Sequence, residues 1–272
     1  MKLSIITINF NNANGLKKTI ESVVTQTYKD FEYIVIDGGS NDGSIEIIKQ
    51  YEMKLAYWVS ERDYGIYNAM NKGILKATGS YCLFLNSGDI LLHNGVLQKS
   101  FSRIALDYDI ISFDLLFDSS IWTRYCNIPD KFHYYDFFST SLPHPSTLIK
   151  RSLFENNLYN ESYKIISDKA WFFDLFYKSN PSFLHVNFPL SLFDMTGISN
   201  CKGDVTTNEW TSHLLKYYSP KDVEYLTGDY KYGLGARVTL MSKSSYKLLL
   251  TLQKILKKLD VLFLYLRSLV SR

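Results

Sequence analysis

The chain has 272 residues, of which 46% belong to the hydrophobic set, and a folded chain of this length buries a core without a disulfide or metal staple. Its formal charge of +3 is too small for the broad basic face of a nucleic-acid-binding protein, so nucleic acid is excluded as a partner. The charge is unevenly spread, because residues 243–272 hold seven Lys and Arg against one Asp and the remainder is net acidic.

The first hundred residues alternate between strand-like and helix-like segments. Runs of apolar and β-branched residues predict four strands, at residues 3–8, 31–36, 55–59 and 81–85. Apolar residues at steps of three and four predict three helices between them, at residues 16–26, 42–51 and 66–77. Alternating strands and helices with short connections imply an α/β fold, with a mainly parallel sheet that helices flank on both faces.

Beyond residue 100 the pattern is less regular. Residues 109–117 predict a strand at the far side of the sheet, and residues 167–177 predict a helix. Residues 125–142 are rich in aromatic side chains and are interpreted as an irregular excursion over the site. Residues 189–197 are typical of a late strand or a loop.

A polar loop follows each of the four predicted strands, at residues 9–12, 37–42, 60–63 and 86–89. Ligands of parallel sheets bind beyond the carboxyl ends of the strands, where such loops converge. Several of the loop residues are carboxylates, so this rim is suited to a bound cation. Two nucleotide motifs are missing from the sequence: no G-x-G-x-x-G follows the first strand, and Ser44 stands where a P-loop requires Lys.

Four blocks of sequence around these loops resemble the inverting GT-A glycosyltransferases of family 2. They are SIITINFN at 4–11, VIDGGSNDGS at 35–44, SERDYGIYNAMNKG at 60–73 and FLNSGD at 84–89. Weaker similarity continues through HPST at 144–147, ISD at 166–168 and GIS at 197–199. The resemblance implies a GT-A fold and transfer of one sugar from a nucleotide-sugar, a UDP-sugar, to a saccharide acceptor. The Gln-x-x-Arg-Trp signature of processive synthases is missing, which favours addition of a single sugar.

The resemblance places three residues around the base of the nucleotide. Asp37 occupies the position of a carboxylate that contacts the base, and Thr7 and Asn9 are expected to line the same site. The alternative from the residues alone is turn chemistry, because Asn and Asp favour turns at strand ends.

The resemblance implies that the block after the third strand faces the nucleotide and sugar phosphates. Arg62 suits a diphosphate, and Asp63 lies beside it. The alternatives are a helix N-cap for Asp63 and a solvated charge for Arg62. Lys72 is interpreted as a solvated charge on the face of the following helix.

Asp89 is the predicted metal ligand, for Mg²⁺ or Mn²⁺. Such an ion would stabilise the charge on the departing nucleoside diphosphate. The acidic motif of the family usually carries further carboxylates, whereas this chain has Asn86 and Gly88 in those places. That departure predicts one protein ligand and weak affinity for the metal without the nucleotide.

The resemblance places the general base at Asp168, flanked here by Ser167 and Lys169. The alternative is an N-cap for the helix that follows, because Asp is favoured at that position. The resemblance also places His144 near the acceptor or the diphosphate, although a lone His is more often structural.

These assignments predict a GT-A catalytic domain at residues 1–228, with a nucleotide half at about 1–100 and an acceptor half at about 101–228. A basic amphipathic tail follows at residues 229–272, where apolar residues at helical spacing run from 246 to 270. Binding to an anionic membrane surface is the preferred interpretation of the tail, for which a lipid-linked acceptor would be fitting. Packing on the catalytic domain, or pairing as a coiled coil in a homodimer, are the alternatives.

The resemblance implies a setting in bacterial surface polysaccharide assembly, and we expect the chain at the cytoplasmic face of the plasma membrane. Three cysteines without a C-x-x-C pair fit a reducing compartment, and the N-terminus reads as a strand rather than a signal peptide. Two rival functions are a sugar-phosphate nucleotidyltransferase and a non-catalytic, membrane-associated scaffold on the same fold. The first is disfavoured because the loop after the first strand has no Arg, and the second is favoured by Asn86 and Gly88.

Overall fold

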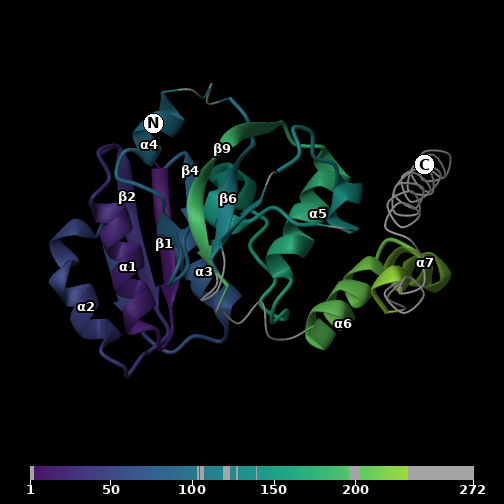
Figure 1. Ribbon diagram of the computed structural model, residues 1–272. Coiled ribbons are helices and arrows are strands. Elements are labelled where there is room, and N and C mark those ends of the chain that lie inside the picture. The colour runs from purple at the N-terminus through teal and green to yellow at the C-terminus, as the bar shows by residue number, and fades with distance from the viewer. Residues whose placement is uncertain are drawn as a thin grey trace. The chain divides into compact units, whose positions relative to one another are not determined.

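The computed structural model describes residues 3–102, 104, 107–118, 123–126, 128–138, 140–195 and 203–231 (Figure 1). The chain divides into two compact units, residues 1–210 and 211–272, and each unit is described by itself. The domain boundary at residue 228 stays a prediction. The predicted tail helix at residues 246–270 lies outside the described residues, as does the GIS block at 197–199.

The described strands form one nine-stranded sheet. Its order is β3-β2-β1-β4-β8-β6-β9-β5, and β7 pairs with β6 off this path. The strands are β1 Leu3–Asn9, β2 Phe31–Asp37, β3 Tyr57–Ser60, β4 Tyr81–Phe84, β5 Ile90–Leu91, β6 Ile110–Asp118, β7 Thr123–Cys126, β8 Thr147–Lys150 and β9 Phe183–Asp194.

In the first unit, helices connect and flank these strands (Figure 1), and α7 belongs to the second unit. The α-helices are α1 Ala13–Val24, α2 Ser44–Gln50, α3 Ile66–Lys76, α4 Val96–Phe101, α5 Ser167–Ser179, α6 Gly203–Leu214 and α7 Pro220–Lys231. Short 3-10 helices are η1 Glu52–Lys54, η2 Tyr134–Phe138, η3 His144–Ser146 and η4 Arg151–Phe154.

The first hundred residues fold as predicted. The four predicted strands are β1 to β4, all parallel to one another, and the three predicted helices are α1, α2 and α3. The helix predicted at 167–177 is α5. The α/β fold class is therefore confirmed, and the second half adds antiparallel pairs to the parallel ones.

The two faces of β1 explain why helices cover both sides of this part of the sheet. Successive strand residues point to opposite faces, so Leu3 and Ile5 face one side and Ile6 the other. The first side packs with α1 and α2 in one buried cluster, and these two helices lie together beside β1 and β2 (Figure 1). On the other side a Cβ at Gly73 of α3 would come within 2.5 Å of Ile6 Cγ2. The missing side chain at Gly73 thus allows α3 to lie close against the sheet.

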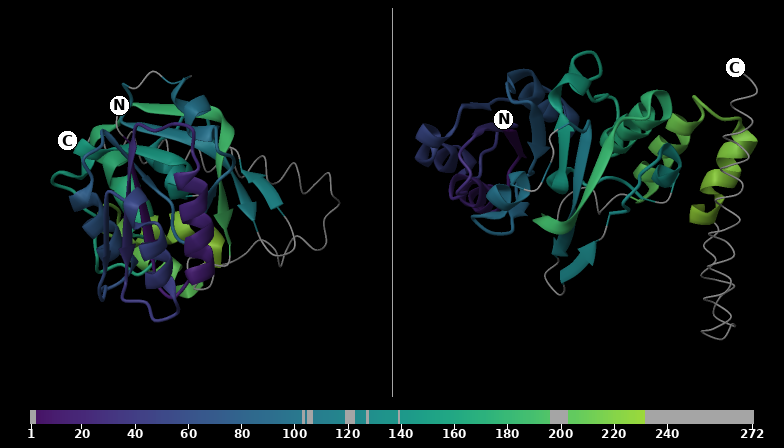
Figure 2. Two further views of the ribbon diagram at one scale, coloured as in Figure 1. Left: turned by 90° about the vertical axis from the view of Figure 1, so that its left-hand side faces the viewer. Right: turned by 90° about the horizontal axis from the view of Figure 1, so that it is seen from above.

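The second half of the sheet differs from the expected arrangement. The strand predicted at 109–117 is β6, which lies inside the sheet between β8 and β9 rather than at its far side. The late strand β9 begins at Phe183, six residues before the predicted start. β6 pairs with β8 at its beginning and with β7 at its end, so the β6–β7 pair extends beyond β8 (Figure 2).

The aromatic-rich stretch at 125–142 packs largely inward. Phe132, Phe137 and Phe138 are buried. Phe137 contacts Phe176 of α5, with ring centroids 5.6 Å apart, and Phe138 contacts Phe173 at 6.0 Å. The three Phe side chains of this stretch therefore belong to the core beside α5.

Two helices near the end of the described chain were not predicted. In the first unit, Trp210 of α6 packs against Phe173 at a centroid distance of 5.5 Å. In the second unit, Ser219 caps α7, because its hydroxyl accepts the Asp222 N–H at 3.3 Å and donates to Asp222 Oδ2 at 2.7 Å. Among the described residues, no helix combines the length and the apolar character that crossing a membrane requires.

Candidate active site

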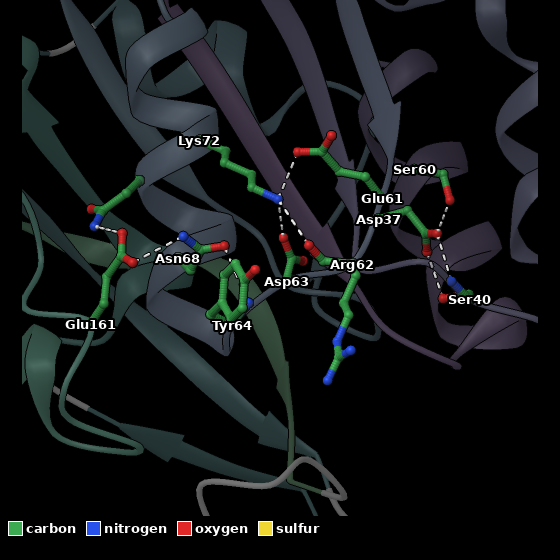
Figure 3. Close-up of polar contacts among 11 residues, drawn as sticks. Asp37, Ser40, Ser60, Glu61, Arg62, Asp63, Tyr64, Asn68, Lys72 and Glu161 are labelled. Atoms are coloured by element: carbon green, nitrogen blue, oxygen red, sulfur yellow. Dashed lines mark hydrogen bonds and ion pairs between the residues drawn. The ribbon is translucent and has the colours of Figure 1, made fainter.

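Four neighbouring strand ends are tied together by side-chain hydrogen bonds. Asn9, Asp37 and Ser60 end β1, β2 and β3 and are register partners in the sheet. Asn9 donates to Asp37 Oδ1 at 2.7 Å. Ser60 donates to Asp37 Oδ2 at 2.6 Å (Figure 3). Ser87, in the loop after β4, donates to Asn9 Oδ1 at 2.7 Å, so the predicted convergence of the four loops is confirmed.

Asp37 is the centre of this network and has no exposed surface. It also accepts the Ser40 hydroxyl at 2.6 Å and the Ser40 backbone N–H at 2.9 Å (Figure 3). Burial on its own would raise the pKa of the Asp37 carboxyl, but hydrogen bonds from Ser40, Ser60 and Asn9 outweigh it and hold the pKa below its ordinary value. Asp37 therefore supports the loops of the predicted base site from beneath and presents no oxygen at the surface.

The two residues predicted beside Asp37 are also buried. Asn9 is 4% exposed, and its amide donates to Asp37 and, at 3.2 Å, to the Ser40 hydroxyl. Thr7 lies two residues before the end of β1, has no exposed surface, and pairs its hydroxyl with Tyr33 at 2.9 Å. The structure thus brings Asn9 and Asp37 together but leaves Thr7 inside the core.

Phe10 is a surface residue of this site that the sequence analysis missed. It follows Asn9 directly and its ring is 64% exposed. A Cβ at Gly38 would come within 3.1 Å of the Phe10 ring and 3.0 Å of Asp63 Oδ2, so Gly38 lets these two groups approach. A large aromatic residue inside a polar loop was the available signal, because an exposed flat ring amid hydrogen-bonding groups suits a base.

Lys72 holds the loop at residues 61–63 (Figure 3). Its ammonium lies 2.7 Å from Asp63 Oδ1 and 2.8 Å from Glu61 Oε1. The interpretation of Lys72 as a solvated charge was wrong, because the helical spacing of α3 carries no information about the loop that its side chain meets. Burial raises the pKa of the Asp63 carboxyl, and Lys72 opposes that rise. Asp63 is not the N-cap of α3 either, since Gly65 occupies that position.

Arg62 is exposed in the middle of this loop. Its backbone carbonyl accepts a hydrogen bond from Lys72 at 3.4 Å. Its side chain extends away from the Lys72 contacts, and no residue in the described part of the chain pairs with its guanidinium (Figure 3). Lys72 thus holds the loop through Glu61 and Asp63, the residues on either side of Arg62, and the Arg62 guanidinium remains available to a ligand.

Asp89, the predicted metal ligand, is 2% exposed in the loop after β4. Its Oδ2 accepts the Asn86 N–H at 3.1 Å and its Oδ1 accepts the Asp194 N–H at 3.0 Å. Burial raises the pKa of Asp89 to about 7, and the nearby charge of Asp194 adds to the rise. A bound cation would offset both effects.

The oxygen donors of the loop after β4 are of the kind that a divalent cation with few protein ligands takes. Asn86 Oδ1 is buried and has no hydrogen-bond partner among the described residues. A carboxylate and an amide oxygen are the hard donors that Mg²⁺ and Mn²⁺ prefer. In the described ranges no group of three or more His, Cys, Asp or Glu side chains is placed to hold a metal ion, so water and phosphate oxygens would have to complete its shell.

Asp168 and His144, far apart in the sequence, are brought together at the start of α5. Asp168 Oδ2 lies 3.8 Å from His144 Nδ1, and the Asp168 side chain is 27% exposed. Ile166 is the N-cap of α5, so the capping role weighed for Asp168 is wrong. His144 is 6% exposed and its Nε2 pairs with the Tyr159 hydroxyl at 2.8 Å. Burial lowers the pKa of His144 against the pull of Asp168, which favours a neutral ring.

Helix α3 connects this carboxylate to the clamped loop. The Tyr67 hydroxyl reaches Asp168 Oδ1 at 2.8 Å. Asn71 is buried and exchanges two hydrogen bonds with the backbone of Tyr159, at 2.9 and 3.0 Å. Asn68 donates to Glu161 at 2.9 Å (Figure 3). The helix that carries Lys72 thus also anchors the segment that leads to Asp168.

Glu209 of α6 fixes the chain just before α5. Its carboxylate accepts the backbone N–H groups of three successive residues, Lys164, Ile165 and Ile166, at 2.6, 3.1 and 3.3 Å. Lys164 and Ile165 precede the N-cap Ile166, so Glu209 holds the segment that leads into α5 by its backbone. The sequence offered no signal for this contact, since Glu209 lies 41 positions beyond Asp168.

Comparison with known sequences identifies a family and several relatives. Residues 4–165 match the family described as glycosyl transferase family 2. An uncharacterized glycosyltransferase of Mycobacterium tuberculosis is 48% identical over 88 residues, which cover 32% of this chain and 34% of the relative, so the match spans about a third of that protein's length. A PGL/p-HBAD biosynthesis glycosyltransferase of Mycobacterium bovis is 30% identical over 207 residues, covering 72% of this chain and 78% of the relative.

Comparison with solved structures supports the same fold. Residues 1–349 of S. aureus TarS in complex with UDP-GlcNAc match with a TM-score of 0.65 and 16% identity, covering 88% of this chain and 77% of that one. The mannosyltransferase PcManGT of Pyrobaculum calidifontis, in complex with GDP-Man and Mn²⁺, matches with a TM-score of 0.60 and 14% identity, covering 93% and 79%. At such low identity the likeness establishes the GT-A fold alone.

Proposed function

The chain belongs to glycosyl transferase family 2, and from this premise we propose that it transfers one sugar, with inversion, from a UDP-sugar to a saccharide acceptor. One observation carries the proposal. A partly exposed carboxylate, Asp168, is anchored through α3 to the loop that presents the Arg62 cation, whose guanidinium pairs with no described residue. A base for an acceptor hydroxyl and a cation for a leaving diphosphate are the two groups that this reaction needs.

The strand-end loops are suited to the nucleotide. The exposed Phe10 ring offers a flat face for a base, while Asn9 and Asp37 hold the loops around it. Arg62 provides paired N–H donors for phosphate oxygens. TarS in complex with UDP and with UDP-GlcNAc, and PcManGT with GDP-Man, support a nucleoside diphosphate sugar as the donor.

The proposed step is a single displacement. Asp168 takes the proton of the acceptor hydroxyl, and the freed oxygen forms a bond to the anomeric carbon of the donor sugar. The bond between that carbon and the diphosphate oxygen breaks on the opposite face, and the nucleoside diphosphate leaves with the electron pair. The anomeric configuration therefore inverts, and Arg62 offsets charge on the leaving group.

Asp89, with the oxygen of Asn86, is the proposed site for Mg²⁺ or Mn²⁺. Bound there together with the nucleotide, the ion would supply positive charge to the leaving diphosphate. Because the described residues offer few ligands, we expect the ion to bind weakly without the nucleotide and the nucleotide to bind more tightly with the ion.

A donor panel tests the proposed function. Among UDP-sugars and GDP-mannose, at least one UDP-sugar is expected to release nucleoside diphosphate in the presence of a saccharide acceptor and Mn²⁺. In calorimetry Mn²⁺ should tighten the binding of UDP by about tenfold, roughly 1.4 kcal/mol, and Asp89→Asn should abolish that gain. If Mn²⁺ does not change the affinity of the unaltered chain for UDP, the proposed metal site is contradicted. If the chain binds no nucleotide at all, the proposed transferase activity is contradicted.

We propose further that the acceptor is lipid-linked and serves surface polysaccharide assembly at the membrane. The support is the basic amphipathic pattern at residues 246–270, which lie outside the described residues. The full chain is expected to sediment with vesicles that contain anionic lipid, and a chain ending at residue 245 is expected to stay in the supernatant. Equal sedimentation of the two chains would contradict membrane binding by the tail.

A further inference from the structure

The Tyr67 hydroxyl lies between two acceptors at the start of α5. One is Asp168 Oδ1 at 2.8 Å, and the other is the backbone carbonyl of Ile165, which makes a short hydrogen bond with it. Tyr67 is 3% exposed, so water does not compete for its hydroxyl. A phenol carries a single proton, and it therefore donates fully to only one of these oxygens at a time.

The two arrangements of this proton match the two states of a general base. When Asp168 is ionised, Tyr67 donates to the carboxylate. When Asp168 has taken a proton, the carboxyl O–H donates to the phenol oxygen, and the phenol O–H turns to the Ile165 carbonyl. Every O–H donor keeps an acceptor in both states, so neither state leaves one of these hydroxyl protons without a hydrogen bond.

We propose that Tyr67 is a positioning residue that holds the Asp168 carboxylate in its ionised and its protonated state during transfer. The inference rests on the proposed function, because it concerns the base of that same site. The Ile165 carbonyl is needed for this role, because it accepts the phenol O–H when Asp168 is protonated. Glu209 holds the same segment by accepting the Ile165 N–H at 3.1 Å.

The other groups near Asp168 are either too distant for a strong hydrogen bond with its carboxylate or engaged in other contacts. His144 Nδ1 is 3.8 Å from Asp168 Oδ2, which is too long for a strong hydrogen bond, and its other nitrogen pairs with Tyr159. The Lys169 ammonium lies over the Trp210 ring, 4.5 Å from its centroid. Other titratable groups near the segment in the described part of the chain include Tyr163 and Lys164 on the segment itself, Glu161, which accepts from α3, and Glu209, which accepts from the backbone. Burial and Asp168 raise the pKa of Tyr67 well above its ordinary value, so it remains a donor at any assay pH.

The first test compares Tyr67→Phe with Tyr81→Phe in pH–rate profiles. Tyr81 is similarly buried and also donates to a backbone carbonyl, that of Tyr108. It is the first residue of β4 and lies at the end of the parallel strands opposite to the candidate site. Tyr67→Phe is expected to lower kcat about tenfold or more with the donor KM within about twofold. Losing the donor to the ionised carboxylate should also move the acid limb of the profile to higher pH. Tyr81→Phe should leave the position of the limb unchanged.

An unmoved acid limb in Tyr67→Phe, with a folded and active variant, would overturn the inference. The second test needs no activity, and it separates this inference from the proposed function. Melting temperatures of Tyr67→Phe, Asp168→Ala and the double variant form a cycle, because each single substitution removes the hydrogen bond between the two side chains, and the loss in the double variant should fall short of the sum of the single losses. If the unaltered chain transfers no sugar, the proposed function fails, and the cycle still tests the contact. Additive losses in the cycle would overturn the contact between Tyr67 and Asp168, whether or not the chain transfers sugar.

Discussion

Replacing Asp168 by Asn is expected to lower the rate of sugar transfer by about a thousandfold, while UDP binds within about twofold of its normal affinity. The substitution keeps the size of the side chain and leaves Oδ1 to accept from Tyr67, but an amide takes no proton from the acceptor hydroxyl. The nucleotide loops stay intact, because their hydrogen bonds involve Asn9, Asp37 and Ser60. Transfer is measured as nucleoside diphosphate release, and binding by calorimetry.

Asp174→Asn is the matched control for this variant. Asp174 lies on the same helix, six residues further on, and pairs with Lys178 at 3.4 Å. We expect it to transfer sugar at nearly the normal rate, because its carboxylate has no part in the proposed site. Normal transfer by Asp168→Asn would show that the base is a different residue.

Asp37→Ala is expected to lower the free energy of unfolding by about 3–5 kcal/mol and to abolish measurable UDP binding. The substitution removes the common acceptor of Asn9, Ser40 and Ser60 and leaves their donors buried without it. Since these donors set the positions of three strand-end loops, the nucleotide site should lose its shape along with the stability. Urea unfolding and calorimetry are the measurements.

The pH dependence of this loss has a defined sign. Hydrogen bonds hold the pKa of Asp37 below its ordinary value, so its stabilisation is fully present above the unfolded pKa of about 3.9 and is lost as pH falls through the folded value. The stability gap between the normal chain and Asp37→Ala should therefore narrow below about pH 4. Asp42→Ala, an exposed Asp of the same loop, should cost about 1 kcal/mol or less. Equal losses for Asp37 and Asp42 would contradict the central position of Asp37.

The strands and loops of the first hundred residues were predictable because their signals are local. β-branched runs and turn residues define β1 to β4. Because the strands are parallel, Asn9, Asp37 and Ser60 then lie together at the carboxyl ends of the strands. The motif blocks likewise pointed to Asp168 and His144, which the fold brings within 3.8 Å. The second half gave weaker signals, because β6 and β9 carry long aromatic and apolar runs whose register depends on distant partners.

The contacts that position the site were not predictable in the same way. Lys72 reads as an ordinary charge on a helix, and only the folded loop reveals that it clamps Asp63 and Glu61. Tyr67 reads as an apolar helix residue, although its hydroxyl meets a carboxylate 101 positions away. Glu209 meets its three N–H donors across more than 40 positions. Side-chain spacing specifies which face of a helix is buried, but it carries no information about which polar groups contact that face in the folded protein.

Helix α3 constrains how this chain can diverge in length. Tyr67 and Asn71 form one row on the helix, directed to the base segment, and Asn68 and Lys72 form the adjacent row, which meets Glu161 and the clamped loop. One residue inserted or deleted between Asn68 and Asn71 would turn the second member of each row by about 100° relative to the first, and each row would lose one of its two contacts. Insertions that are tolerated therefore have to fall outside Ile66–Lys76, and among homologues this helix should keep its register while the surrounding loops change length.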